Sequence, residues 1–303
     1  MKIVVAGGSG FIGRSLVARM RADNHTVVTL TRAPAKAGST DTAGPEVVQW
    51  DGRTMGEWAA CLDGADAIVN LAGESLDGKR WTSAQKERIM RSRVEVTHTL
   101  RDAVARASRK PSVLVNASAV GYYGSVEEGD VTEEYPSGKG FLAETCVSWE
   151  NGAESIGELG LRVVKLRLGV VLAAQGGALR KMVLPFRLFA GGPMGSGRQW
   201  FPWVHCDDVT EIAMLALQNA SVIGPVNVTA PESVNMKTFC AALGGALHRP
   251  SWAPVPAALL RIALGEMSDM LLTGQRVVPA KLQRLGYTFR FPTLALALSD
   301  IIH

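Results

Sequence analysis

The chain opens on a short run of β-branched apolar residues, 2–6, and closely spaced glycines follow it at once. Such a run is typical of a strand buried on both faces, as in a parallel sheet. Apolar residues at helical spacing then predict a helix over 11–20. The same kinds of pattern predict strands over 25–31, 45–51, 65–71, 112–117 and 161–167, and helices over 83–108 and 141–159. Strands that alternate with helices predict an α/β fold, a Rossmann-like doubly wound parallel sheet.

The pattern is less regular in the second half of the chain. We interpret residues 1–170 as a nucleotide-binding Rossmann domain whose core is completed by later segments around 200–230. Residues 171–303 are predicted to form a smaller C-terminal substrate or lid region on one side of that domain. The segment 257–264 is amphipathic, and we expect it to be a core helix.

Composition excludes several classes of function. Of the 303 residues, 47% are hydrophobic and 20% are charged, which fits a globular chain with a sizeable core. The net charge is only +4 and no block of like charges occurs, so we expect no nucleic-acid partner. No apolar stretch reaches the roughly 18 residues that a membrane span needs, so we expect no membrane partner.

The cysteines and the first residues predict a location. The cysteines lie far apart, with no Cys-x-x-Cys pair and no histidine at metal-ligand spacing, so we expect no metal site. Reduced thiols of this kind fit a cytoplasmic protein. A core strand starts at residue 2, from which we expect no signal peptide.

The glycines behind the first strand predict a dinucleotide site. Gly7 permits a tight turn, Gly10 lets a pyrophosphate approach the backbone, and Gly13 lets the helix pack closely on the strand. The alternative is a glycine-rich turn without a ligand, but strand, glycines and helix come in the required order. The other residues of this turn and helix start are therefore candidate cofactor contacts: Ser9, Phe11, Ile12 and Arg14.

The residue at the end of the second strand favours NADP over NAD. Proteins that bind NAD usually place an acidic residue about 20 residues after the glycines, where it binds the ribose 2′-hydroxyl. This chain has Arg32 there and no acid over 29–33. An arginine can bind the 2′-phosphate of NADP with two hydrogen bonds, with Arg14 as a second cation. The alternative is that Arg32 is a solvated loop charge.

Further candidates follow the later strands. Ligands of doubly wound sheets bind beyond the carboxyl ends of the strands. Asp51, the turn Leu71-Ala72-Gly73 and Ser118 all follow or end predicted strands, so we expect them on one rim with the glycine turn.

At this point the chain resembles the extended short-chain dehydrogenase/reductase superfamily of nucleotide-sugar epimerases. The resemblance rests on 6–13, 70–73, 116–124, 166–172 and 195–208. Finer markers resemble its atypical YfcH-like branch of "epimerase family" proteins: 121–124, 141–144 with Trp149-Glu150, and 279–287. The resemblance implies NADP binding and a small DUF1731-like C-terminal domain over 250–303. It implies a small-molecule substrate, and a monomer or a homodimer.

The resemblance also exposes a gap in the expected chemistry. Members of the superfamily use a Tyr and, four residues later, a Lys on one helix face, with a Ser about 24 residues before the Tyr. Ser118 matches the serine. With Glu150 as the anchor, the Tyr position falls on Leu142 and the Lys position on Cys146. Leu142 cannot titrate, and Cys146 is a thiolate only if a cation lowers its pKa.

Several residues are candidates to fill this gap. Tyr122 and Tyr123 follow the serine strand, and Glu144 can act as a base if it is partly buried. Each has a simpler alternative, in packing or as a surface acid. Other candidates line the pocket: Arg93 for the cofactor, and Trp81 and His205 for the substrate. His205 can equally be a structural histidine that bonds Asp207 or the backbone.

Two hypotheses remain open from the sequence. The first is an NADP-dependent oxidoreductase or epimerase that acts on a nucleotide sugar or a small carbonyl compound. The second is a catalytically silent NADP(H)-binding sensor or interaction protein, which the missing Tyr–Lys pair favours.

Overall fold

The computed structural model describes residues 1–32, 46–76, 79–174 and 176–302. Pro45, the first residue of one predicted strand, lies outside them. Within this part of the chain, no helix is long and apolar enough to cross a membrane.

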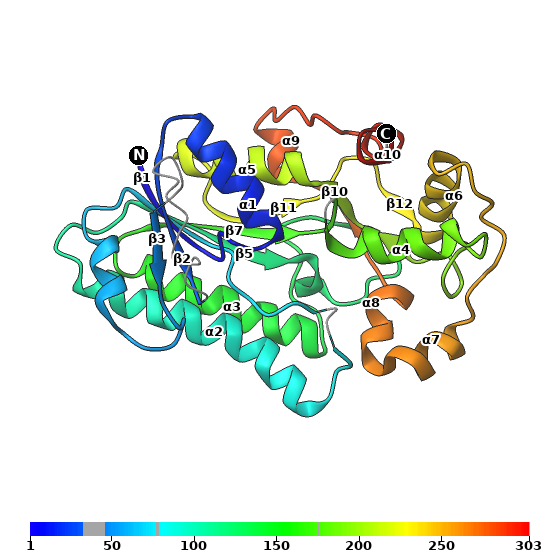
Figure 1. Cartoon of the computed structure of the whole chain (residues 1–303), viewed down its shortest axis with the longest axis horizontal. Helices are drawn as coiled ribbons and strands as arrows, with labels where there is room; N and C mark the ends of the chain where they lie inside the picture. Colours follow the sequence, from blue (N-terminus) through cyan, green and yellow to red (C-terminus); the bar gives the residue numbers. More distant parts are fainter. Residues whose placement is uncertain (33–45, 77–78, 175, 303) are drawn as a thin grey trace, which may run out of the picture.

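A parallel sheet forms the centre of the molecule, as predicted, and it has seven strands, one more than the six predicted (Figure 1). The spatial order is β3-β2-β1-β4-β5-β7-β11. The strands are β1 Lys2–Ala6, β2 Thr26–Thr31, β3 Glu46–Gln49, β4 Ala67–Asn70, β5 Val113–Ala119, β7 Arg162–Leu168 and β11 Gly224–Val228. The order reverses direction between β1 and β4, where Val5 pairs with Val69 on one side and with Thr29 on the other. This reversal creates the crevice in which doubly wound sheets bind ligands.

Helices cover both faces of the sheet. Helices α1 (Phe11–Ala22) and α5 (Cys206–Gln218) lie on one face, and α2 (Ser83–Arg106) and α3 (Phe141–Gly157) on the other (Figure 1). Successive strand residues point to opposite faces, so Ile3 and Val5 join the α1–α5 core while Val4 and Ala6 join the α2–α3 core. Burial on both faces explains why the strands are apolar runs without alternation.

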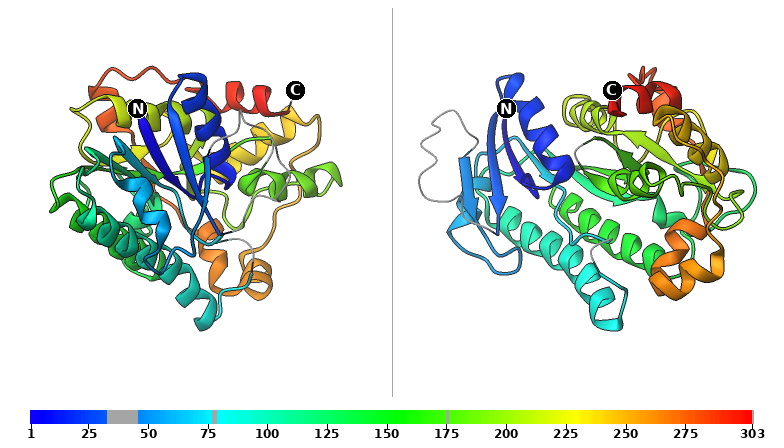
Figure 2. Two further views of the ribbon diagram at one scale, coloured as in Figure 1. Left: turned by 60° about the vertical axis from the view of Figure 1, so that its left-hand side comes forward. Right: turned by 45° about the vertical axis from the view of Figure 1, so that its right-hand side comes forward.

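A third core lies beside the sheet, between α4 (Gly177–Arg187), α6 (Met236–Ala246) and α10 (Leu294–Ile302). Short strand pairs connect it to the sheet: β8 (Val170–Leu172) with β10 (Trp203–His205), and β9 (Trp200–Phe201) with β12 (Val234–Asn235). Figure 2 shows these elements grouped at one end of the molecule.

Helix α7 (Ala257–Leu264) corrects one expectation. We expected a core helix here, but none of its residues is buried, and Leu259 and Ile262 are exposed. It continues into the short helices η3 (Gly265–Ser268) and α8 (Asp269–Leu272). Its Leu260 and Leu264 are half-buried, so the described chain covers the apolar side of this helix only in part.

The last segment runs back over the nucleotide-binding half. Strand β13 (Arg276–Val277) pairs in parallel with β6 (Asp130–Val131), and α9 (Ala280–Arg284) inserts Leu282 into the sheet core. The buried Asp208 carboxylate of α5 accepts hydrogen bonds from the backbone N–H of Arg290 and Phe291, at 2.8 and 3.0 Å. The proposed boundary at residue 170 stays a prediction.

Candidate nucleotide-binding site

The turn between β1 and α1 needs glycine for two physical reasons. Gly7 has a φ of +82°, and a Cβ there would lie 2.8 Å from the carbonyl carbon of Leu71. A Cβ on Gly13 would overlap the carbonyl oxygen of Gly7. The turn is therefore pressed between α1 and the end of β4, which places it at the reversal point of the sheet.

The N-terminus of α1 is left without a side-chain cap. Gly10 is the N-cap residue and donates its N–H to the carbonyl of Gly7 at 3.0 Å, and the first turn holds no acidic residue. The guanidinium of Arg14 donates to the carbonyl of Ser9 at 3.0 Å, which keeps a cation beside the turn. Unbonded N–H groups and the positive end of the helix dipole form an anion site.

The side chains of Phe11 and Ile12 support this turn. Phe11 packs on the start of α4, where a Cβ on Gly176 would lie 2.6 Å from the ring. Ile12 packs against the core under α1. The two side chains hold α1 and α4 together next to the anion site.

Arg32 is exposed at the carboxyl end of β2, the strand next to β1. No hydrogen bond or ion pair to a described residue engages its guanidinium. It is thus an unpaired cation beside the glycine turn.

Asp51 follows β3 on the same rim, but its carboxylate already has partners. It accepts hydrogen bonds from the backbone N–H of Thr54 and Arg53 and from the Thr54 hydroxyl, at 2.7 to 2.8 Å. These bonds, led by the one from the Thr54 backbone, lower the pKa of Asp51 to about 2. Asp51 therefore stays ionised and shapes its own loop.

A buried amide pair holds the turn after β4. Asn70 donates to the side-chain oxygen of Asn116 on β5 at 2.7 Å and accepts from the N–H of Ala72 at 3.2 Å. This bond fixes the backbone of Leu71, Ala72 and Gly73 against the glycine turn. Both asparagines lie in the motifs 70–73 and 116–124, but no role was predicted for them. The sequence signal for this pair was an asparagine near the end of each of two apolar strands.

A buried ion pair lies beneath Ser118. The Ser118 hydroxyl donates to Glu150 of α3 at 2.7 Å, and Glu150 binds the guanidinium of Arg167 of β7 with two hydrogen bonds of 2.9 Å. Burial lowers the pKa of Arg167, but the bonds and charge of Glu150 outweigh it and raise that pKa. Sequence reasoning missed this role of Arg167. Charged residues inside the apolar strand 162–168 were the signal, because buried charges need partners.

The two tyrosines of η2 (Val120–Tyr123) differ in their surroundings. Tyr123 is buried, accepts from Arg167 at 2.9 Å and donates to Asn227 of β11 at 2.5 Å. Burial raises the pKa of Tyr123 to about 12, and these partners give it a structural role. Tyr122 is half-buried, with the Arg167 guanidinium 3.5 Å from its ring centroid. Of the two, Tyr122 is the one that remains accessible.

The face of α3 toward η2 carries Leu142 and Cys146. A Cβ on Gly121 would lie 3.3 Å from Leu142 Cβ and 4.0 Å from Cys146 Sγ. Burial raises the pKa of the Cys146 thiol to about 11, so the thiolate expectation is not met. Glu144 is exposed in the first turn of α3, which does not meet the condition of partial burial under which we expected a base.

Arg93 of α2 brings a half-buried cation to the same rim. Its guanidinium carbon would lie 3.0 Å from a Cβ on Gly73, and it lies 5.2 Å from the ring centroid of Trp149. Its hydrogen bonds go to Ser92 and to the carbonyls of Ile89 and Glu74. Burial lowers the pKa of Arg93, and no carboxylate of a described residue lies within ion-pair distance. Such a cation suits an oxygen-rich ligand.

The two predicted substrate residues are held inside the protein. Trp81 is buried edge-on against Phe141 and donates to the carbonyl of Leu76 at 3.0 Å. His205 is buried at the start of α5, where Nδ1 accepts from the N–H of Asp207 at 3.2 Å. Its ring stacks on Phe291, and burial lowers its pKa. His205 therefore takes the structural alternative that the sequence left open.

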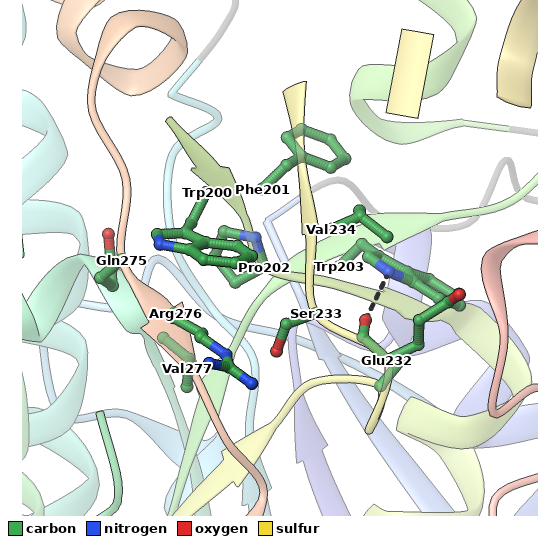
Figure 3. A pocket seen from close by; sticks show the side chains of 11 residues that line it. Trp200, Phe201, Pro202, Trp203, Glu232, Ser233, Val234, Gln275, Arg276 and Val277 are labelled. Atoms are coloured by element: carbon green, nitrogen blue, oxygen red, sulfur yellow. Dashed lines mark hydrogen bonds between the residues drawn. The ribbon is translucent and has the colours of Figure 1, made fainter. Parts of the chain in front are cut away.

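A shallow hollow of about 180 Å³ lies between β9, β12 and β13 (Figure 3). Arg276 faces the ring of Trp200 at 5.4 Å, and Trp203 lies buried behind it, donating to the carbonyl of Glu232 at 3.1 Å. That volume includes open solvent and the hollow encloses almost no space of its own, whereas a small-molecule site encloses roughly 300 Å³ or more. The candidate site is therefore the rim of the sheet.

Sheet order, glycine turn and rim serine together define an extended short-chain dehydrogenase/reductase. The chain belongs to the NAD dependent epimerase/dehydratase family, whose model matches residues 3–229. A second model, a domain of unknown function called DUF1731, matches residues 255–301. These matches confirm the resemblance that the motifs carried.

Several relatives are similar over the whole chain. It is 44% identical to "Epimerase family protein SDR39U1 homolog, chloroplastic" of Arabidopsis thaliana, of which it covers 87%. It is 39% identical to "Epimerase family protein YfhF" of Bacillus subtilis, of which it covers 98%. The crystal structure of human epimerase family protein SDR39U1 with NADPH matches with a TM-score of 0.89, at 36% identity over 100% of this chain and 99% of that one. One relative is chloroplastic, so the expected cytoplasmic location stays a prediction.

Proposed function

We propose that the protein binds NADP(H) and uses it for redox chemistry on a nucleotide sugar or a small carbonyl compound. One observation carries the cofactor: an uncapped helix N-terminus lies behind a glycine turn, with the unpaired Arg32 on the adjacent strand. The helix end suits a pyrophosphate and the guanidinium a 2′-phosphate. The human relative solved with NADPH supports the same cofactor.

Arg32→Ala tests this cofactor preference. Loss of a charge-assisted bond should weaken NADPH binding about tenfold or more, and leave NADH binding nearly unchanged. Arg21→Ala is the matched control, because Arg21 is an exposed arginine in the last turn of α1, away from the site. Titration calorimetry with both nucleotides measures the effect. Equal losses for NADPH and NADH would show that Arg32 does not bind the 2′-phosphate.

The rim residues suggest how a carbonyl would be held. Bound NADPH would supply a hydride to the carbonyl carbon, and the oxygen then requires one proton. Ser118 is buried and donates to Glu150, and we assign it to orienting the substrate from beneath the rim. We assign the proton to the phenol of Tyr122, which is half-buried and positioned by Arg167. We assign Arg93 to an oxygen of the cofactor or substrate, because it is half-buried and no carboxylate of a described residue lies within ion-pair distance.

A catalytically silent NADP(H)-binding protein is the second candidate. It is favoured by Leu142 and Cys146, which face η2 where a titratable pair is expected. A screen for NADPH oxidation against carbonyl compounds and sugar nucleotides separates the two. Turnover that Tyr122→Phe lowers, with NADPH affinity unchanged, supports the enzyme. Tight NADPH binding without turnover of any compound supports the silent protein.

A further inference from the structure

Helices α4, α6 and α7 lie at one end of the molecule (Figures 1 and 2). Exposed apolar side chains and cations occur together in these segments. On α4 and the residues after it, Leu188 and Phe189 are exposed, and Trp252 lies beside them with its indole N–H on the carbonyl of Phe189 at 3.1 Å. On α7, Ile262 is 74% exposed. We call this end the basic apolar face.

Phe189 is held in an unfavourable conformation at this face. It follows the last residue of α4 with a φ of +60°, and Ala190 donates back to the carbonyl of Pro185 at 2.9 Å. Helices that end this way usually have glycine at this position, because bulky residues are strained there. Phe189 is also 56% exposed, so burial of its side chain does little to offset the strained backbone. Both observations indicate a role at the surface.

The charge of this face has one sign. The sequence has no Asp or Glu between Glu158 and Asp207, nor between Glu232 and Glu266. Arg187 and Arg249 flank Phe189, with the Arg249 guanidinium 4.6 Å from its ring centroid, and Arg261 adjoins Ile262. None of these three arginines has a carboxylate of a described residue within ion-pair distance.

We propose that the basic apolar face binds the surface of an anionic lipid bilayer. Exposed aromatic and aliphatic side chains enter the headgroup boundary, and unpaired arginines bind lipid phosphates. A second copy fits less well, because a two-fold contact would set arginines against arginines. The proposal departs from the sequence-based expectation of no membrane partner, which rested on the lack of a spanning segment, because it concerns attachment to a membrane surface. It is independent of the nucleotide site.

Sedimentation with lipid vesicles tests the proposal on the full chain. We expect binding to phosphatidylcholine vesicles that contain about 30% phosphatidylglycerol, weakening as salt rises, and little binding to phosphatidylcholine alone. Absence of binding to the anionic vesicles would overturn it, and so would equal binding to both.

Phe189→Gly separates a surface role from a structural one. Glycine relieves the strained φ, so Tm should stay the same or rise while vesicle affinity falls about tenfold. Ile262→Ser should also lower the affinity. Ile223→Ser is the control, because Ile223 is 57% exposed but lies between α5 and β11. The face is not the membrane contact if the control loses as much affinity as Phe189→Gly. A dimer that Phe189→Gly dissociates, without vesicle binding, would assign the face to a second copy.

Discussion

At the scale of single residues, the glycine turn is set by contacts that a side chain would break. Gly13 lies against the carbonyl of Gly7, so α1 can approach β1 only without a Cβ. The spacing of the glycines alone predicted this turn, because the constraint acts between residues that are close in the sequence. It could not predict the partners of Ser118 and Tyr123, which come from α3, β7 and β11.

Gly13→Ala should destabilise the protein and remove the cofactor site together. Overlap with the turn should cost about 1–3 kcal/mol in the free energy of unfolding and weaken NADPH binding strongly. Gly245→Ala is the control, since a Cβ there would meet no atom within 4 Å inside α6. It should stabilise by about 0.5–1 kcal/mol. Urea unfolding and NADPH titration give both readouts. Normal NADPH affinity in Gly13→Ala would contradict the role of this glycine.

At the scale of elements, alternating patterns predicted the sheet and three of its four covering helices, because each of these elements buries a continuous apolar face; α5 was not predicted. The prediction of a core helix was wrong for α7, none of whose residues is buried. Periodicity reports that a helix has an apolar side, and it does not report what covers that side. The same limit applies to the candidate site, where Trp81 and His205 were predicted as pocket residues but pack inside.

The stability of the protein should depend on pH through His205, the residue at the start of α5. Its neutral ring accepts the N–H of Asp207, and burial holds its pKa below the unfolded value of about 6.5. The unfolded chain therefore binds the proton more readily, so this contribution to stability is complete above about pH 6.5 and is lost as pH falls through the folded pKa.

His205→Asn keeps a cap acceptor that does not titrate. We expect Tm to fall less between about pH 7.5 and 5.5 in this variant than in the wild type. Thermal unfolding followed by circular dichroism measures both. An identical pH dependence in the two proteins would show that His205 does not govern stability in this range.

At the scale of the whole molecule, the last fifty residues are joined to the nucleotide-binding half rather than appended to it. Leu282 and Phe289 belong to the sheet core, and Asp208 accepts two backbone N–H groups and the Tyr287 hydroxyl. The sequence predicted a smaller region on one side of the nucleotide-binding domain, and the resemblance implied a DUF1731-like tail, which the matching model over 255–301 confirms. Neither predicted which residues join the tail to the sheet, because long-range contacts leave no periodic pattern. We expect the chain to unfold in one transition.

Asp208→Asn tests this integration. The amide has one acceptor oxygen instead of two. The free energy of unfolding of the whole chain should therefore fall by about 2–3 kcal/mol. Asp207→Asn is the control, because Asp207 forms an exposed pair with Arg290 that contributes about 0–1 kcal/mol. Calorimetry and tryptophan fluorescence should report the same midpoint. Separate early release of residues 255–301 would instead identify the tail as an independent unit.

The pairing of β13 with β6 has a consequence for synthesis on the ribosome. Residues 276–277 complete a ladder that residues 130–131 begin, and Val277 packs in the same cluster as Tyr123. The glycine turn and its neighbouring strands emerge long before this partner exists. A nascent chain would thus have its phosphate cradle early, whereas the tyrosine side of the rim becomes fixed only when translation is nearly finished.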